Sequence, residues 1–405
     1  MANVSSSNGL EKRPKLRFPG FDEPWKATKF GNLVHEFSDR TKEENEDLLL
    51  SAAIEGMFLN TELFGHQRGA SNKGYKKIKY GTMVLSTQNL HLGNANVNQR
   101  FEHGMVSPAY KTYDITGCSV ELIAQWIKSE AAKRFFYNAT TVGASVCRRN
   151  VEWDTLYEQP LYLPGIDEQD KIAKFLFLIS ERINKQQQFI VSLKKYKRGL
   201  LSREFGQQEN GVLNNRYVGK LKDYFHLSSG STPSSTNRAF YSGNIRWVSS
   251  GELKPKYLCE TSQHISSEAV SSCNLREYPA NTLLVAMYGL EAAGVRGTAS
   301  ILSVLATISQ ACMAIQQTGE IDIEYLYYWY IYNGQWIGIQ IAQGTKQHNL
   351  STDTLGNLRI HAPSCSKQKK VCKLLSQIDY LIEKECKKID LLSSVKRGLL
   401  QQLFI

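Results

Sequence analysis

The chain has 405 residues, of which 42% are hydrophobic and 21% are charged, and it contains 16 Phe, 20 Tyr and 6 Trp. This composition excludes collagen, a disulfide-rich miniprotein and extensive disorder, and the length predicts two or three domains. The formal net charge is +11, but the excess lies at residues 1–16 (+2), 166–205 (+4) and 365–405 (+5), whereas 17–165 and 206–364 are neutral. Because Lys-rich helix faces are usually only solvated, this charge is weak support for nucleic-acid binding.

The eight cysteines include no C-x-x-C pair. This excludes a zinc ribbon or a thioredoxin-type motif and favours reduced thiols in the cytoplasm. Residues 1–16 are expected to form a flexible tail and not a signal peptide, because they lack an apolar core. Residues 325–345 carry no charge, but amides and glycines interrupt the apolar run that a membrane span needs. We therefore expect a buried helix there, and a cytoplasmic protein with no membrane partner.

The predicted elements fall into two globular regions, each followed by a long helix. The first region, 17–165, has a strand at 81–87, a helix near 119–136 and a loop at 143–150. A helix at 166–205 and a polar linker at 206–215 follow. The second region, 216–364, opens with KLKDYFHLSS at 220–229, which is similar to KFGNLVHEFS at 29–38. It has predicted strands at 244–248 and 282–288, a helix at 324–341 and a loop at 344–349, and a second long helix follows at 365–405.

An internal repeat at an offset of 199 residues relates the two halves. Residues 150–205 and 349–404 align without a gap and are identical at 20 of 56 positions, including KRGLL at 197–201 and 396–400. Such self-similarity indicates duplicated supersecondary units. It predicts an α+β protein in which a pseudo-twofold axis relates two mixed α/β domains.

Both long helices carry a heptad seam, in which apolar residues alternate at steps of four and three. Two matching seams in one chain predict that the helices pair as an antiparallel coiled coil separating the domains; the alternative is two amphipathic helices packed on separate cores. Each seam has one polar position, which can fix the register of a coiled coil. The seam residues are Ile172, Leu176, Ile179, Ile183, Gln186, Ile190, Leu193, Val371, Leu375, Ile378, Ile382, Glu385, Ile389 and Leu392.

Common catalytic signatures are missing. The sequence contains no G-x-x-x-x-G-K-[ST], H-E-x-x-H or G-x-S-x-G motif, and no Asn-Pro-Pro or Asp-Pro-Pro followed by an aromatic residue. The histidines are dispersed, and a lone His is more often structural than catalytic. We therefore expect a protein that binds and does not itself catalyse, with no catalytic residue, metal site or cofactor in this chain.

The chain resembles the specificity subunit of type I restriction-modification enzymes over nearly its whole length. The resemblance is carried by LPGIDEQDKIAKFL…KRGLLSREF and APSCSKQKKVCKLL…KRGLLQQLF, and in the second region by LSSGSTPSS…FYSGNIRWVSSGEL, ISQACMAI and GTKQHNLSTDTL. One departure is Lys367, at the place where the family usually has a Glu, as at Glu168 here.

The resemblance implies two target recognition domains, at 17–165 and 216–364, each reading one half of a bipartite, asymmetric site in double-stranded DNA. The helices would fix the spacer between the half-sites and dock two methyltransferase subunits. S-adenosylmethionine, ATP and Mg would be bound by these subunits and by separate restriction subunits.

Candidate DNA contacts follow from the side chains that reach phosphates and base edges: Lys for phosphate, Arg for guanine, and Asn or Gln for adenine. A solvated basic loop is the alternative for the first group, and a strand-end core pair for Arg246 with Trp247. The candidates are Arg68, Asn72, Lys73, Tyr75, Lys76, Lys77, Lys79, Arg148 and Arg149 in the first domain, and Ser231, Thr232, Arg238, Tyr241, Arg246, Lys346, Gln347 and His348 in the second.

Two functions of other classes remain open on the sequence alone. A non-catalytic coiled-coil scaffold with protein-binding globular ends would not retain DNA at low salt. A stand-alone nuclease would need an acidic metal-binding cluster, and none stands out in the sequence.

Overall fold

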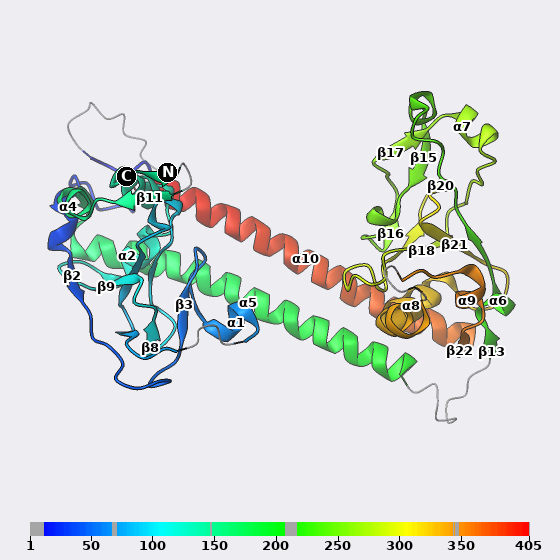
Figure 1. Cartoon of the computed structure of the whole chain (residues 1–405), viewed down its shortest axis with the longest axis horizontal. Helices are drawn as coiled ribbons and strands as arrows, with labels where there is room; N and C mark the ends of the chain where they lie inside the picture. Colours follow the sequence, from blue (N-terminus) through cyan, green and yellow to red (C-terminus); the bar gives the residue numbers. More distant parts are fainter. Residues whose placement is uncertain are drawn as a thin grey trace. The chain divides into compact units, whose positions relative to one another are not determined.

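The computed structural model describes residues 12–66, 71–145, 148–206, 217–342, 344 and 348–404, and of 143–145 and 148 it describes the backbone alone (Figure 1). The chain divides into two compact units. Unit 1 comprises Met1–Gln188 and Cys386–Ile405, and unit 2 comprises Phe189–Glu385. Both long helices are divided between the units: α5 spans Ile166–Phe205 and α10 spans Cys365–Leu403. Each unit therefore contains one of the two globular regions and a part of each long helix.

Unit 1 is built on a four-stranded antiparallel sheet in the order β2-β9-β6-β7. Its strands are β2 (Val34–Phe37), β6 (Met83–Ser86), β7 (Ala95–Val97) and β9 (Tyr110–Ile115). Four two-stranded pairs surround it: β1 (Lys26–Lys29) with β12 (Pro160–Leu163), β3 (Leu50–Ala52) with β4 (Met57–Leu59), β5 (Lys76–Lys79) with β8 (His103–Val106), and β10 (Thr140–Ser145) with β11 (Arg148–Val151). The short helices are α1 (Asn60–Phe64), α2 (Val120–Trp126), α3 (Glu130–Asn138) and α4 (Trp153–Glu158).

The core of unit 1 brings together segments that are far apart in the chain. Leu176 of α5 and Leu400 of α10 belong to the same buried cluster as the sheet residue Met83. The segment before β1 covers this cluster: the Leu16 amide donates to the Gln402 carbonyl at 3.0 Å, and the Arg17 guanidinium binds the buried Glu168 carboxylate through two bonds of 2.8 Å. The end of α10 is therefore an integral part of unit 1.

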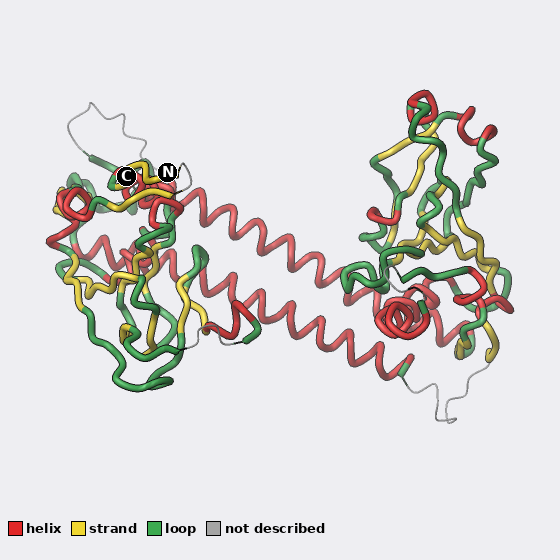
Figure 2. Tube along the Cα trace, in the orientation of Figure 1, coloured by secondary structure: helices red, strands yellow, loops and turns green. Residues whose placement is uncertain are grey.

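Unit 2 has a larger mixed sheet in the order β14-β21-β18-β19-β16 and a smaller one in the order β17-β15-β20, and both appear as yellow segments in Figure 2. The strands of the larger sheet are β14 (Phe225–Ser229), β16 (Tyr257–Leu258), β18 (Leu283–Ala286), β19 (Ala299–Leu302) and β21 (Cys312–Gln317). The smaller sheet contains β15 (Ile245–Val248), β17 (Gln263–Ile265) and β20 (Thr307–Ile308), and β13 (Tyr217–Lys220) pairs with β22 (Arg359–Ala362). The helices are α6 (Leu221–Tyr224), α7 (Ser267–Ser272), α8 (Ile323–Trp336), its π-helical extension Ile337–Ile341, and α9 (Thr352–Gly356).

The aromatic helix α8 is the centre of the unit 2 core. Residues 325–330 are all buried, and the five aromatic side chains among them pack in one cluster with Leu201 and Phe205 of α5 and Leu375 of α10. This explains the uncharged stretch in the sequence: it faces the protein interior. None of the helices in the described ranges combines the length and apolar character required to cross a bilayer.

The repeat extends to individual hydrogen bonds. Gln169 accepts from the Ser119 amide at 2.8 Å and donates to the Pro164 carbonyl at 2.9 Å. Its repeat partner Gln368 accepts from the Asp322 amide and donates to the Pro363 carbonyl, both at 2.9 Å. Ser119 and Asp322 are the N-caps of α2 and α8. Each glutamine thus fastens the start of a long helix to the start of a core helix in its own unit.

Three local predictions need correction. The helix expected near 119–136 is two helices, because Ser129 accepts the Ala132 amide and begins α3 as a new N-cap. The loop expected at 143–150 is largely the β10–β11 hairpin. The helix expected at 324–341 ends as α-helix at Trp336 and continues as a π-helix.

Candidate DNA interface

Several candidates of unit 2 lie between β14 and β15 or on β15 itself. Ser231, Thr232 and Arg238 are exposed. The loop that holds the first two is fixed by backbone contacts: the Ser231 amide donates to the Ile308 carbonyl at 3.1 Å, and a Cβ on Gly230 would lie 2.3 Å from that oxygen. A side chain at position 230 would push the loop away from β20. The exposed hydroxyls therefore sit on a rigid support.

Aromatic side chains behind this loop are structural. The Tyr241 hydroxyl donates to the Pro233 carbonyl at 2.8 Å, its ring packs edge-on against Trp247 at 5.9 Å, and the indole N–H of Trp247 donates to the Ser231 carbonyl at 3.3 Å. Arg246 is half-buried and lies 3.8 Å from Glu260. Its Nε is buried and has no hydrogen-bond partner among the described residues. One N–H donor of the guanidinium is therefore unused.

His348, which precedes α9, is held by two contacts. Its backbone amide donates to the Glu291 carboxylate at 3.0 Å, and its Nδ1 lies 3.1 Å from the Gly338 carbonyl. Hydrogen bonds from backbone amides, including that of His348, hold the pKa of Glu291 below its ordinary value. The candidates Lys346 and Gln347 lie outside the described residues.

The candidates around β5 in unit 1 divide into buried and exposed side chains. Asn72 is buried and bonds to Asn45, donating to its carboxamide oxygen at 2.8 Å. Lys76 is buried as well; its ammonium donates to the Tyr110 carbonyl at 2.8 Å, and burial lowers its pKa. These two side chains are used inside the fold, because their polar groups already have internal partners.

The remaining cations of this segment are accessible to different degrees. Lys73 is exposed, Lys79 is exposed and lies 3.1 Å from Asp114, and Lys77 is half-buried in an ion pair with Glu46. Tyr75 is half-buried, and its amide donates to the Thr41 hydroxyl at 3.0 Å. Arg68 lies outside the described residues. The strand β5 therefore alternates inward and outward lysines, as a half-buried strand does.

Arg149 is part of the β10–β11 hairpin. Its guanidinium donates to the hydroxyl and to the carbonyl of Thr140, both at 2.7 Å, and stacks over the Tyr137 ring at 4.2 Å. The side chain of Arg148 is not among those described.

Residues 216–393 match the family model of the Type I restriction modification DNA specificity domain. This part of the chain is therefore similar to a type I DNA specificity domain. The specificity subunit of the type I restriction enzyme MjaIX from Methanocaldococcus jannaschii is 29% identical over 192 residues, which are 46% of this chain and 43% of that protein. The match thus spans less than half of the length of this curated relative. The resemblance to type I specificity subunits predicted from the sequence is confirmed.

Two solved structures share the fold across nearly the whole chain. One, described with complex assembly and conformational transition of a type I restriction-modification system, has a TM-score of 0.60 at 13% identity and covers 95% of this chain and 98% of its own. The other, the S subunit of a type I system from M. genitalium, has a TM-score of 0.59 at 14% identity and covers 97% and 99%.

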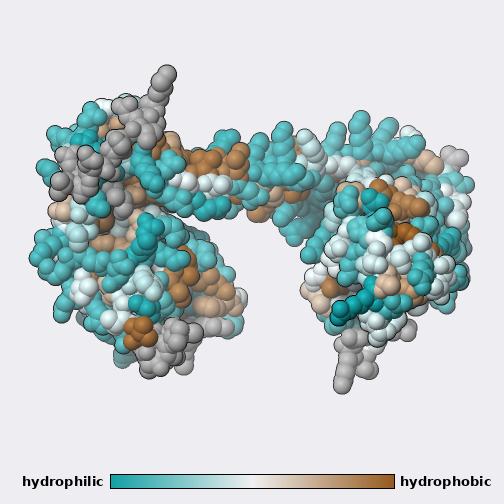
Figure 3. Space-filling model, turned by 90° about the horizontal axis from the view of Figure 1, so that it is seen from above, coloured by the Kyte–Doolittle hydropathy of each residue, from teal (hydrophilic) through white to brown (hydrophobic). Residues whose placement is uncertain are grey.

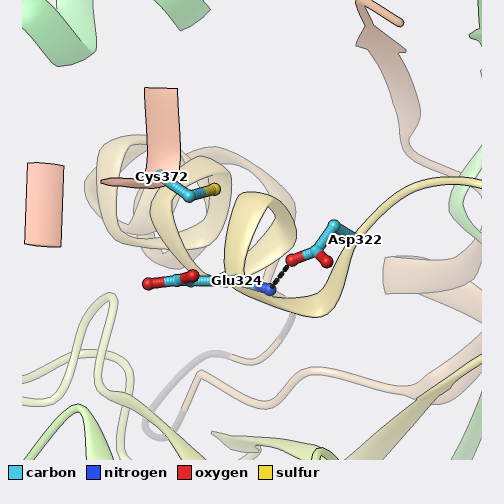
Figure 4. Close-up of side chains that lie close together, drawn as sticks. All are labelled: Asp322, Glu324 and Cys372. Atoms are coloured by element: carbon cyan, nitrogen blue, oxygen red, sulfur yellow. Dashed lines mark hydrogen bonds between the residues drawn. The ribbon is translucent and has the colours of Figure 1, made fainter. Parts of the chain in front are cut away.

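Within residues 216–393, one cluster has the residue types of a metal site (Figure 4). The Asp322 carboxylate caps α8 by accepting the Glu324 amide at 2.8 Å. The Glu324 carboxylate accepts hydrogen bonds from Lys256 and, at 2.6 Å, from Ser376. Burial raises the pKa of the Cys372 thiol, which favours its neutral form. Capping and ion pairing account for both carboxylates, so the cluster is a structural element of unit 2.

Reasoning from the sequence missed Lys256. It lies 68 residues from Glu324 and 120 from Ser376, and no motif or periodicity connects them. Only the fold brings these polar groups together.

Proposed function

We propose that the chain is the DNA-binding specificity subunit of a type I restriction-modification complex and performs no catalytic step itself. Each recognition domain, 17–165 and 216–364, reads one half of a bipartite, asymmetric DNA site. The observation that carries this proposal is the match of residues 216–393 to the DNA specificity domain. The repeated glutamine contacts at the starts of α5 and α10 support extending the role to the first domain.

We further infer that α5 and α10 pair as an antiparallel coiled coil. Two contacts support the pairing, one inside each unit: Lys197 with Asp379 at 2.5 Å in unit 2, and Lys396 with Ser180 at 2.7 Å in unit 1. The repeat exchanges these contacts, since Lys197 corresponds to Lys396 and Ser180 to Asp379. An antiparallel pair of duplicated helices would make contacts related in this way. In this arrangement the helices, each of about 60 Å at 1.5 Å per residue, set the spacer between the half-sites.

The expected partners besides double-stranded DNA are two methyltransferase subunits and restriction subunits, which would bring S-adenosylmethionine, ATP and Mg, in the cytoplasm. Apolar side chains exposed on the helices suit a protein partner. Figure 3 shows such hydrophobic side chains among hydrophilic ones. Those on α5 and α10 are Ile166, Phe175, Phe177, Leu178, Phe189, Val191, Tyr196, Leu374, Tyr380, Leu381, Leu391 and Val395.

The proposed DNA contacts are the accessible candidates together with those outside the described residues. In unit 2 we favour the rigid loop around Ser231 and Thr232, with Arg238 beside it. In unit 1 we favour Lys73, Lys77 and Lys79. If Arg238 reads a base, its replacement by Ala costs about 1–3 kcal/mol of binding free energy and relaxes one base position.

Methylome sequencing tests the function directly. Cells co-expressing the chain with its cognate methyltransferase subunit should acquire a split motif carrying N6-methyladenine, absent without the chain. Replacing residues 216–364 by the same region of a relative should change one half of the motif. A soluble complex that produces no motif and does not retain DNA at low salt would contradict the proposal and favour the coiled-coil scaffold.

A further inference from the structure

Unit 2 contains a chain of polar side chains that connects its recognition domain to both long helices. Lys256, in the segment between β15 and β17, donates to Glu324, to the Tyr328 hydroxyl at 2.9 Å and to the Ser376 hydroxyl at 2.6 Å. Tyr328 of α8 donates to Asp379 of α10 at 2.9 Å, and Asp379 also binds Lys197 of α5 at 2.5 Å. We call these six residues the Lys256 network.

Lys256 lies in the chain segment that connects the two sheets of unit 2. β15 and β17 are neighbouring antiparallel strands of the smaller sheet, yet the chain between them leaves that sheet, adds β16 to the edge of the larger sheet beside β19, and returns. Lys256 directly precedes β16, and its backbone carbonyl accepts the Ile301 amide at 2.7 Å. The lysine therefore lies where the connection between β15 and β17 meets the edge of the larger sheet, and its side chain reaches α8 and α10.

The network is built for a charged lysine. The ammonium is mostly buried, with 14% of the side chain exposed, and it lies over the rings of Tyr328 at 4.5 Å and Tyr257 at 5.1 Å. Burial opposes the ionised form of Glu324, but hydrogen bonds from Lys256 and Ser376 outweigh it and hold the pKa of the carboxyl below its ordinary value. Removing either partner leaves a partly buried charge without its counter-ion, which is strongly unfavourable.

We propose that Lys256 is a positioning residue for spacer length: it fixes the angle at which the second recognition domain stands on the helices. This inference rests on the proposed function. Each base pair added to the spacer moves the second half-site by about 3.4 Å along the DNA and rotates it by about a tenth of a turn. A rigidly held domain therefore fits its half-site at one spacer length only. A domain held loosely tolerates neighbouring lengths.

Methylation of a duplex library by the complex with its methyltransferase subunit tests the inference. The library joins the two half-sites of the wild-type motif through spacers one or two base pairs shorter and longer. We expect Lys256→Met to lower the preference for the natural spacer by about tenfold, while the base preference inside each half-site stays unchanged. Lys254→Met is the matched control, because Lys254 is exposed two residues away, and it should retain the wild-type profile.

A second pair of variants separates positioning from loss of folding. Lys256→Arg keeps the cation and should restore most of the spacer preference, whereas Glu324→Gln should broaden it as Lys256→Met does. A wild-type spacer profile for folded Lys256→Met, or equal losses at all spacers, would overturn the inference and leave the specificity function intact. If the wild-type complex itself produced no split motif, the proposed function would fail first.

Discussion

Each unit contains the same repeated contact between α5 and α10, but the side chains that make it differ. In unit 2, Lys197 meets the carboxylate of Asp379, which also accepts from Tyr328. In unit 1, the repeat partner Lys396 donates to the Ser180 hydroxyl, and burial lowers the pKa of this lysine. In both units the lysine contacts the same repeat position of the other long helix, but only in unit 2 is the residue at that position a carboxylate. The repeat therefore conserves packing more strictly than electrostatics.

The largest expected effect concerns a buried leucine that each unit has in its own core. Leu176 and Leu375 are repeat partners and both are fully buried. We expect Leu176→Ala and Leu375→Ala each to lower the free energy of unfolding by about 2–5 kcal/mol, because each leaves a cavity. Denaturant unfolding measures both. A difference of more than about 2 kcal/mol between the variants would mean that the two cores are not equivalent.

Removing the polar partner of the lysine should lower the free energy of unfolding more in unit 2 than in unit 1. Asp379→Ala leaves Lys197 and Tyr328 without their shared acceptor, and we expect a loss of about 1–3 kcal/mol in the free energy of unfolding. Ser180→Ala removes one neutral acceptor and should cost about 0.5–1.5 kcal/mol. Ser180→Asp would give Lys396 a carboxylate partner, as Lys197 has in unit 2, and would raise the pKa of Lys396. Thermal unfolding of the three variants should rank them in this order, and equal losses for the first two would contradict the comparison.

The lysines in β5 and just before it should separate into two classes in DNA binding. Replacing the exposed Lys73 by Ala should weaken binding evenly across sequences and reduce the slope of log affinity against log salt by about one. Lys76→Met should lower stability, because Lys76 is buried against the Tyr110 carbonyl, and leave the slope unchanged. Salt titrations of DNA binding by the assembled complex measure both slopes.

The smallest expected effect is the pH dependence of the stability that Glu324 contributes in unit 2. Because the pKa of Glu324 lies below its ordinary value of 4.5, its stabilising effect is complete above that pH and disappears as pH falls through the folded-state pKa. The stability difference between wild type and Glu324→Gln should therefore shrink below pH 4.5. Glu320→Gln, an exposed neighbour, is the control. A difference that stays constant from pH 7 to about pH 3.5 would contradict the ion pair with Lys256.

The sequence predicted the elements that belong to the internal repeat or that have a periodic hydrophobic pattern. The range of α5 matches the prediction at both ends, since Phe205 precedes a polar linker and Ile166 follows Pro164 and Gly165. It also predicted the buried character of α8 from an uncharged aromatic run. It could not predict that Asn72 and Lys76 point inward while Lys73 is exposed, because that depends on the pairing of β5 with β8. The Lys256 network was equally hidden, because its members come from four separate segments.

The joining of distant segments in unit 1 has a consequence for how the protein is made. The buried cluster around Leu176 includes Leu400, Leu403 and Phe404, which the ribosome adds more than 220 residues later. At about 5–20 residues per second, the first domain waits about 10–45 s for these side chains. During that interval its exposed apolar surface is open to chaperones or to the seam of another nascent chain, whereas unit 2 receives α10 directly after its own sheet.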